Sequence, residues 1–180
     1  SISYENRHYV LAITDKETTG APYFVETGHH QPSQLKLEIQ ERVKENVMRI
    51  LDSLEITNGA SHMEFKITDA GDIYFIEVGA RGGGGFISYR LVELSTGYDY
   101  IKGMIEVALG QFTIPKLKKN NYSGVYFFCK ETHSIRDYVQ KNNLLPWIVE
   151  YDIESGGKLI SPQKSQDRSG YVIYSANYKE

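Results

Sequence analysis

The chain has 180 residues, 41% of them hydrophobic, and its 20 Lys and Arg residues against 23 Asp and Glu residues give a net charge of −3. Such a chain can bury a core without disulfides or structural metals, so we expect one large lobe with a smaller appendage. The slightly acidic balance argues against a nucleic-acid partner, because binding to a phosphate backbone requires a basic excess. The apolar runs are shorter than the roughly 18 residues of a membrane span, and no signal-peptide pattern is present, so we expect neither membrane insertion nor export.

Cys129 is the only cysteine, which excludes an intrachain disulfide and favours a reducing compartment, the cytoplasm. It lies in the apolar run 125–129, and no histidine stands at a recognisable spacing from it. We therefore expect Cys129 to be a small buried hydrophobic residue rather than a nucleophile.

The first third of the chain predicts two strands and then a helix. Residues 9–13 and 23–25 are β-prone runs, and the polar residues 14–20 between them indicate a loop. Apolar residues then recur at the spacing of an amphipathic helix, for which Ser33 is the candidate N-cap. The apolar residues of this helix are Ile39, Val43, Val47, Ile50, Leu51 and Leu54.

A β-hairpin is predicted next. Apolar and polar residues alternate over 62–68, a turn signal follows at 69–72, and residues 73–78 read as the return strand. The glycine-rich segment 79–85 cannot continue a sheet, so we expect a loop with a permissive backbone.

A second helix is predicted beyond this loop, with Asp99 as its N-cap and Gly110 as its C-terminal stop. Its apolar face would carry Ile101, Met104, Ile105 and Ala108.

The composition changes near residue 115. Residues 115–121 are polar and basic, and strand-like runs follow at 124–129 and 170–176. We therefore expect a boundary that divides the chain into residues 1–114 and a small C-terminal region, residues 115–180.

The predicted hairpin sets two carboxylates opposite each other. With Ala70 and Gly71 as the central residues of its turn, Glu64 faces Glu77. The other pairs of this register are Thr68 with Ile73 and Lys66 with Phe75. Directly opposed like charges destabilise a sheet unless something intervenes, and a divalent cation is the obvious candidate.

Strand alternation also determines which residues share the acidic face. His62, Glu64, Glu77 and Gly79 lie on one face, and the apolar residues of both strands lie on the other and can pack on a core. These apolar residues are Met63, Phe65, Ile67, Tyr74, Ile76 and Val78. His62 is a candidate to hydrogen-bond a ligand or a metal-bound water, and the alternative is a simple ion pair with a carboxylate.

Two carboxylates without thiolates or clustered histidines suit a hard ion such as Mg²⁺ or Mn²⁺, and Mg²⁺ usually binds one or two carboxylates together with substrate phosphates. Arg81 and four consecutive glycines follow directly, and they can offer a cation and backbone N–H groups to a phosphate or oxyanion. The glycines are Gly82, Gly83, Gly84 and Gly85. The alternative is that Glu64 and Glu77 are solvated charges near Lys66 and that the glycines form a flexible loop.

The order and spacing of several motifs resemble the ATP-grasp superfamily. These motifs are His62-Met63-Glu64-Phe65, Gly71, Ile76-Glu77-Val78-Gly79-Ala80-Arg81, the glycine run and Thr96-Gly97-Tyr98-Asp99. The resemblance covers about residues 5–112 and is to the C-terminal nucleotide-binding lobe of enzymes such as biotin carboxylase, carbamoyl phosphate synthetase and the amino-acid ligases. It implies an α+β fold in which an antiparallel sheet packs against helices, followed by a small β-rich C-terminal region.

The resemblance also implies roles for individual residues. In this family two glutamates bind the Mg²⁺ ions that bridge the ATP phosphates, which corresponds to Glu64 and Glu77. A following arginine contacts the phosphate or acyl phosphate, which corresponds to Arg81 as the catalytic residue. Many members carry an asparagine two residues after the second glutamate as a further metal ligand, where this sequence has Gly79.

Further candidates lie outside the hairpin. Ser88 and Arg90 could meet a substrate carboxylate, although Arg90 could equally pair with Glu93. His29 and His30 are expected in an exposed loop, and as neighbours in a strand-like segment they would point to opposite faces and make a poor chelate.

The implied chemistry resembles carboxylate activation, in which ATP phosphorylates a carboxylate and an amine or another nucleophile then displaces phosphate. The implied partners are small-molecule carboxylate and amine substrates and an N-terminal lobe that would precede Ser1, so we expect a fragment of a larger ligase that is inactive alone. A homodimer is left open. The alternative function is a non-catalytic ATP-grasp-like module that binds nucleotide, metal or a partner, and the substrates are not specified by the sequence.

Overall fold

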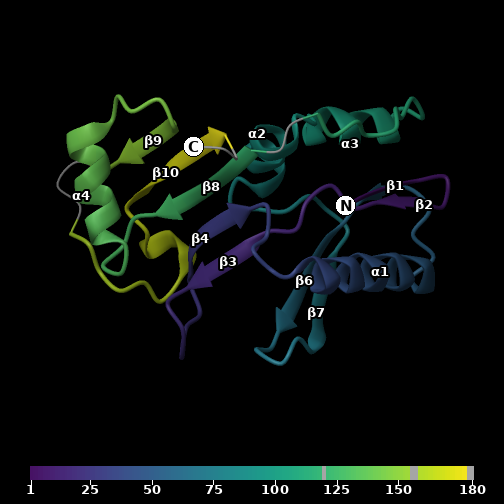
Figure 1. The fold of residues 1–180 in the computed structure, drawn as a ribbon, viewed down its shortest axis with the longest axis horizontal. Coiled ribbons are helices and arrows are strands. Elements are labelled where there is room, and N and C mark those ends of the chain that lie inside the picture. Colours follow the sequence, from purple (N-terminus) through teal and green to yellow (C-terminus); the bar gives the residue numbers. More distant parts are fainter. Residues whose placement is uncertain (119–120, 155–157, 178–180) are drawn as a thin grey trace.

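Among the residues that the structure describes, three antiparallel sheets and four α-helices make up the fold (Figure 1). The computed structural model describes residues 1–118, 121–154 and 158–177. The strands are β1 (Ile2–Tyr4), β2 (Arg7–Tyr9), β3 (Asp15–Thr18), β4 (Glu26–Gln31), β5 (Gly59–Ala60), β6 (His62–Ile67), β7 (Ile73–Gly79), β8 (Asn121–Phe127), β9 (Ile148–Ile153) and β10 (Gly170–Asn177). The helices are α1 (Leu37–Ser53), the π-helical turn η1 (Ile87–Leu91), α2 (Val92–Thr96), α3 (Tyr100–Ala108), α4 (His133–Asn142) and the 3-10 turn η2 (Ser165–Asp167). The expected α+β class, with antiparallel sheets and packed helices, is confirmed.

The largest sheet has five strands in the order β3-β4-β8-β10-β9. Alternate side chains of its central strands are buried on opposite faces, as strand geometry requires. On one face, Val125 and Ile173 pack against Leu91 of η1. On the other face, Val172 packs against Val139 of α4. Helical elements thus cover both faces of this sheet.

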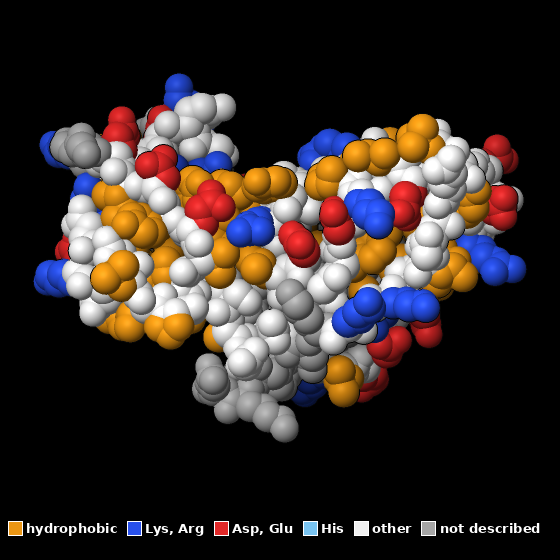
Figure 2. Space-filling view, turned by 90° about the horizontal axis from the view of Figure 1, so that it is seen from above, with side chains coloured by type: hydrophobic (Ala, Val, Ile, Leu, Met, Phe, Trp, Pro, Cys, Tyr) orange, Lys and Arg blue, Asp and Glu red, His pale blue; other side chains and the backbone are white. Residues whose placement is uncertain are grey.

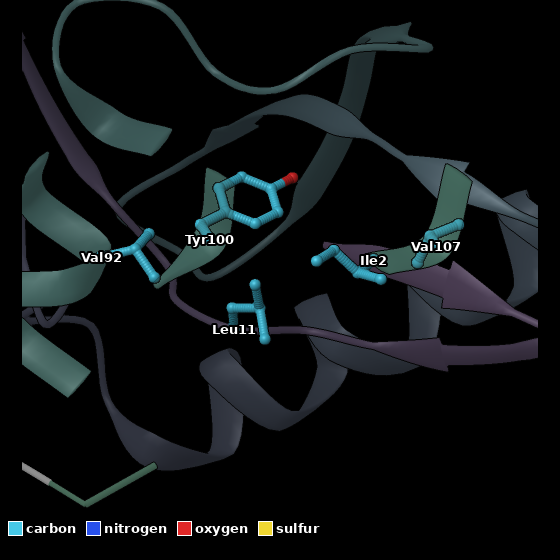
Figure 3. Packing of buried hydrophobic residues seen from close by; sticks show 5 residues of the cluster. All are labelled: Ile2, Leu11, Val92, Tyr100 and Val107. Carbon is cyan, nitrogen blue, oxygen red and sulfur yellow. The ribbon is translucent and has the colours of Figure 1, made fainter. Parts of the chain in front are cut away.

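The small sheet β2-β1-β5 packs against α3. Figure 3 shows the side chains of this cluster converging from β1, α2, α3 and the segment that follows β2. Ile2 is fully buried, and Tyr100 of α3 is only 3% exposed. The cluster consists of Ile2, Leu11, Val92, Tyr100 and Val107.

The hairpin β6-β7 packs one face against α1. Val43, Val47 and Leu51 of α1 form the buried row, as the sequence pattern predicted. They contact one side of the hairpin, including Met63 and Phe65, and so leave the other side of the hairpin for Glu64.

The predicted strands at 9–13 and 23–25 are wrong in position. Residues 10–13 belong to no strand, although Ile13 O accepts a backbone hydrogen bond from Ser33 N at 3.1 Å. Leu11 is buried beside α3, and Val10 and Ile13 are partly buried beside α1. An apolar run indicates that its side chains pack in a core, and these residues do so without belonging to a strand. The polar segment read as a loop contains β3, and Phe24 lies in a turn with φ +49° and is 62% exposed.

The predicted caps of α3 are confirmed, and the predicted N-cap of α1 is wrong. Asp99 caps α3 by accepting a hydrogen bond from Lys102 N at 2.8 Å, and Gly110 follows the helix with φ +67°. Ser33 is not the cap of α1, because Lys36 holds that position and Ser33 Oγ donates to Asp15 Oδ1 at 2.6 Å instead.

The predicted apolar face of α3 is wrong except at Met104, which packs against the core cluster. Ile101 and Ile105 are 39% and 55% exposed, whereas Tyr100, Gly103 and Val107 are the buried residues of this helix. Figure 2 shows hydrophobic side chains gathered over the part of the surface where α3 lies. The helix is apolar on both sides, so its pattern alone did not determine which side faces the core.

The predicted division at residues 114 and 115 falls between α3 and β8. Strand β4 from the first part pairs with β8 from the second, for example His30 with Gly124, so the five-stranded sheet continues across it. Residues 119 and 120 of the predicted boundary segment lie outside the described residues. The division into two units stays a prediction. Cys129 is 1% exposed, as expected.

Substitution of Leu51 by alanine tests the core between α1 and the hairpin. Leu51 is fully buried, so Leu51→Ala should lower the free energy of unfolding by about 2–5 kcal/mol. The control is Leu37→Ala in the same helix, where the side chain is 78% exposed and the change should stay within about 0.5 kcal/mol. Urea denaturation measures both, and equal losses would contradict the packing described here.

Candidate functional site

Glu64 and Glu77 are directly opposed in the β6-β7 hairpin. The register predicted from the sequence is confirmed at this pair, and His62 pairs with Gly79 as alternation requires. Side chains that are directly opposed lie with their Cβ atoms about 4.5–5.5 Å apart. Two carboxylates therefore share one face of the hairpin, on the side away from α1.

Between the glutamates and the turn the predicted register is wrong, and two differences cancel. The turn is longer than predicted: Gly71 N donates to Thr68 O at 2.8 Å, with Gly71 at φ +84°. The pairs beyond the carboxylates are Phe65 with Phe75, Lys66 with Tyr74 and Ile67 with Ile73. A β-bulge at Ile76 adds one unpaired residue to β7 and restores the opposition of the glutamates.

The bulge also changes which residues of β7 face the core. Ile73 joins the cluster beside α1, and Phe75 contacts Phe65 at a centroid distance of 5.9 Å. Tyr74 and Ile76, expected on the core face, are 56% and 59% exposed.

Lys16 is the residue that sequence reasoning missed. Its ammonium hydrogen-bonds Glu64 and lies 3.1 Å from Oε1 of Glu26. Burial lowers the pKa of Lys16, but the hydrogen bonds with Glu64 and Glu26 outweigh it and the pKa is raised. Lys16 lies in β3, within the segment that was expected to be a loop. No sequence pattern therefore predicted that it would lie beside the hairpin.

His62 stands beside Glu64, with Nε2 3.2 Å from Oε1. Burial, followed by the nearby ammonium of Lys16, lowers the pKa of His62. Burial raises the pKa of Glu64, but Lys16 and His62 lower it overall. The carboxylate is therefore ionised and is held at one oxygen, Oε1.

Glu26 and His29 extend this network into the five-stranded sheet. His29 Nε2 is 3.7 Å from Glu26 Oε1, an ion-pair rather than a hydrogen-bond separation. His29 and then Lys16 lower the pKa of Glu26 to about 2, against the opposing effect of burial. His29 is 1% exposed in β4, so the expectation of an exposed loop is wrong. His29 and His30 do point to opposite faces, since His30 Nδ1 lies 2.9 Å from the hydroxyl of Tyr174.

The glycine loop packs against two histidines, His29 and His62. Gly85 O lies 3.0 Å from Nδ1 of His29, and a Cβ at Gly85, which has φ +54°, would collide with the His29 ring. A Cβ at Gly83 would stand 2.9 Å from Nδ1 of His62. A Cβ at Gly84 would have no other atom within 4 Å. The loop thus needs glycine where it meets the histidines, which connects it to both carboxylate-bearing sheets.

Arg81 lies at the start of this loop and is exposed. Its Nη1 donates to Gly82 O at 2.9 Å, and its stem occupies the space beside Gly79, where a Cβ would be 3.3 Å from Arg81 Cγ. Its charge contributes to the lowered pKa of His62. The guanidinium is therefore close to the carboxylates and accessible to an anion.

A second arginine reaches the site from the C-terminal region. Arg168 Nη1 donates to Glu26 O at 3.2 Å, and its guanidinium carbon lies 3.8 Å from the centroid of Phe127. A Cβ on Gly85 would contact the same Phe127 ring at 3.5 Å. Arg168 and the glycine loop thus adjoin the same Phe127 ring, although no motif near residue 168 indicated this position.

Ser88 and Arg90, the further candidates, take different positions. Ser88 is 5% exposed, and its hydroxyl is buried without a hydrogen-bond partner in the described part of the chain. A Cβ at Gly82 would stand 2.7 Å from this hydroxyl, so Ser88 adjoins the loop. Arg90 lies 3.9 Å from Glu93 and 3.8 Å from Glu150, so its ion-pair alternative is the one observed.

The donor set fits one hard cation. Two opposed carboxylates can bind Mg²⁺, with water and phosphate oxygens in the remaining positions. Within residues 1–118, 121–154 and 158–177, no group of three or more His, Cys, Asp and Glu side chains is arranged to hold a metal. Any further ligands would therefore come from solvent or substrate.

Residues 3–89 match the family model of the ATP-grasp domain. This segment of the chain is therefore similar to an ATP-grasp domain. Among curated protein sequences, none matches the chain significantly. No helix among the described residues is long and apolar enough to cross a membrane.

Solved structures share the fold of this chain. The L-amino acid ligase from Bacillus licheniformis is 23% identical, with a TM-score of 0.77 over 99% of this chain and 46% of that one. Phosphoribosylglycinamide synthetase from Anaerococcus prevotii is 21% identical, with a TM-score of 0.75 over 98% and 47%. Biotin carboxylase from Campylobacter jejuni, in complex with beta-gamma-ATP, is 18% identical, with a TM-score of 0.65 over 98% and 40%. The chain spans less than half the length of each of these three chains.

The pKa of Glu26 predicts an acid-dependent loss of stability. Because its pKa is about 2 in the folded chain and about 4.3 when unfolded, its contribution to stability is fully present above the unfolded pKa and declines as the pH falls toward 2. After allowance for solvent screening, we expect about 1–2 kcal/mol. Unfolding free energies measured from pH 6 to pH 2.5 should fall less steeply in Glu26→Gln, and parallel curves would contradict the network.

Two adjacent glycines test how the loop is seated. Gly85→Ala should destabilise the chain by about 1–3 kcal/mol, because its Cβ meets His29 and its backbone has a positive φ. Gly84→Ala, in open space at the neighbouring position, should change the free energy of unfolding by at most about 0.5–1 kcal/mol. Chemical denaturation compares the two, and an equal effect would show that the loop is not seated on His29.

Proposed function

We propose that this chain is the part of an ATP-dependent ligase that binds ATP and Mg²⁺ and activates a carboxylate as an acyl phosphate. The observation that carries the proposal is the opposition of Glu64 and Glu77 directly before a glycine loop flanked by Arg81. An amine or another nucleophile would then displace phosphate to form the product bond. Small-molecule carboxylates and amines are the proposed substrates.

Glu64 and Glu77 are the proposed metal ligands, since oxygen donors on one face of a hairpin suit Mg²⁺ or Mn²⁺. When bound there, the cation would neutralise charge on the transferring phosphoryl group. His62 supports this arrangement by contacting Glu64 Oε1 and by seating Gly83 of the loop.

The remaining residues would bind the anion. Arg81 is the proposed catalytic residue, because an exposed guanidinium can make bidentate hydrogen bonds to a phosphate or acyl phosphate. Backbone N–H groups of Gly82 to Gly85 can approach the same oxygens without side chains in the way. Arg168, which adjoins Phe127, contributes a second cation from the C-terminal region. This arrangement stabilises negative charge and requires no nucleophile from the protein.

The similar structures support a ligase that uses ATP. Their names include an L-amino acid ligase and a phosphoribosylglycinamide synthetase, and the biotin carboxylase was solved with an ATP analogue. Because this chain spans less than half of each, we propose that a further lobe of the same polypeptide completes the ATP site. A cytoplasmic location, expected from the single Cys129, remains part of the proposal.

Thermal unfolding with millimolar Mg²⁺ or Mn²⁺, with and without ATP, tests the paired carboxylates. A ligand that binds only the folded state raises its stability, by about 2.7 kcal/mol at 100 times its Kd, so we expect the unfolding temperature to rise by several degrees. Glu64→Gln and Glu77→Gln should each abolish this rise. The control is Asp69→Asn, an exposed carboxylate in the turn of the same hairpin.

The outcomes separate the proposed ligase from the alternative module. A rise that survives both glutamate substitutions, or no rise at all, would contradict a metal site at the hairpin. Release of phosphate from ATP that depends on an added carboxylate would support the ligase. Binding of nucleotide with no such release in the longer polypeptide would favour a non-catalytic module.

A further inference from the structure

Lys16 occupies a position between two carboxylates of the site. Its ammonium contacts Glu64 and lies 3.1 Å from Glu26, and its side chain is 24% exposed. Each carboxylate is flanked by a histidine, since His29 lies beside Glu26 and His62 beside Glu64. The ammonium is therefore a built part of the site rather than a surface charge extended into solvent.

The charges around the hairpin favour one divalent ion over two. Glu26, Glu64 and Glu77 carry three negative charges, and Lys16 offsets one of them. The exposed guanidinium of Arg81, beside Gly79 and Gly82, adds a further positive charge. Before any substrate anion binds, one divalent cation already neutralises the remaining negative charge, and a second ion would add to an excess of positive charge.

The available ligands lead to the same count. In the part of the chain that the structure describes, no third His, Cys, Asp or Glu joins Glu64 and Glu77 in a metal-binding group. Gly79 has no side-chain ligand, and the stem of Arg81 occupies the space beside it. Two carboxylates suffice for one Mg²⁺ that keeps water or phosphate ligands, whereas two ions would have to share them.

The contacts of Glu64 show how Lys16 and a metal can share one carboxylate. Lys16 and His62 both contact Oε1. No hydrogen bond or ion pair between described residues ends on Oε2. The carboxylate thus offers its second oxygen to a ligand while the first is held in place, the arrangement by which hydrogen-bonding neighbours orient metal ligands.

We propose that Lys16 takes the place of a second metal ion, so that Glu64 and Glu77 hold a single divalent cation. This inference rests on the proposed function, because it assumes that the paired carboxylates bind a metal. Cations that share one site lie about 4 Å apart. At that distance an ammonium weakens the binding of a doubly charged ion by more than about tenfold, even with the dielectric constant of water.

Titration with Mn²⁺ alone, followed by electron paramagnetic resonance of the free ion, tests the proposal on the 180-residue chain. We expect one Mn²⁺ per chain and about tenfold or tighter binding in Lys16→Met. Lys16→Arg, which keeps the charge, should bind within about threefold of the parent chain. Lys141→Met, in α4 and away from the hairpin, is the matched control and should also stay within about threefold.

A second variant addresses folding, because Lys16→Met leaves Glu26 and Glu64 to repel each other. Lys16→Met combined with Glu26→Gln removes this repulsion and should bind Mn²⁺ more tightly than Glu26→Gln alone. Two ions in the parent chain, or no tightening in either Lys16→Met background, would overturn the role of Lys16 while leaving the metal site in place. No binding by the parent chain or any variant would overturn both this inference and the metal site of the proposed function.

Discussion

Opposition of Glu64 and Glu77 is the constraint around which the site is organised. Two carboxylates facing each other on a hairpin repel, and the repulsion must be offset by positive charge from elsewhere in the chain. The structure supplies that charge from separate elements: Lys16 comes from β3, and Arg81 follows β7. The hairpin and the five-stranded sheet are therefore connected electrostatically at this point, as well as by packing.

The glycine loop connects the same two parts of the fold. It leaves the hairpin beside His62 and reaches the five-stranded sheet at His29, and at each contact a side chain on the loop would collide with a ring. The histidines thus act as seats for the backbone, in addition to lying beside Glu64 and Glu26. Arg168 extends the surroundings of the loop into the C-terminal region, so residues far apart in sequence line one site.

The sequence predicted the fold class, α1 and the cap of α3, because these depend on local periodicity and on residues near one another. It also predicted the opposed glutamates, although the turn and the bulge that produce this pairing were not predicted and compensate each other. It did not predict Lys16 or Arg168, since their positions depend on how β3 and the segment before β10 are placed beside the hairpin. The apolar run 9–13 misled the strand assignment because it is buried without a strand partner. His29 was misplaced because its strand, Glu26–Gln31, contains few β-branched residues and is identified mainly by its neighbours.

The bulge at Ile76 has a consequence for comparing this chain with its relatives. A hairpin with a two-residue turn and no bulge would present the same two carboxylates with the same number of residues between them, because the longer turn and the bulge compensate each other. A single inserted residue without such compensation would rotate one glutamate to the side of α1. A sequence alignment that assigns one gap to this hairpin, instead of two compensating gaps or none, would pair the wrong residue with Glu77.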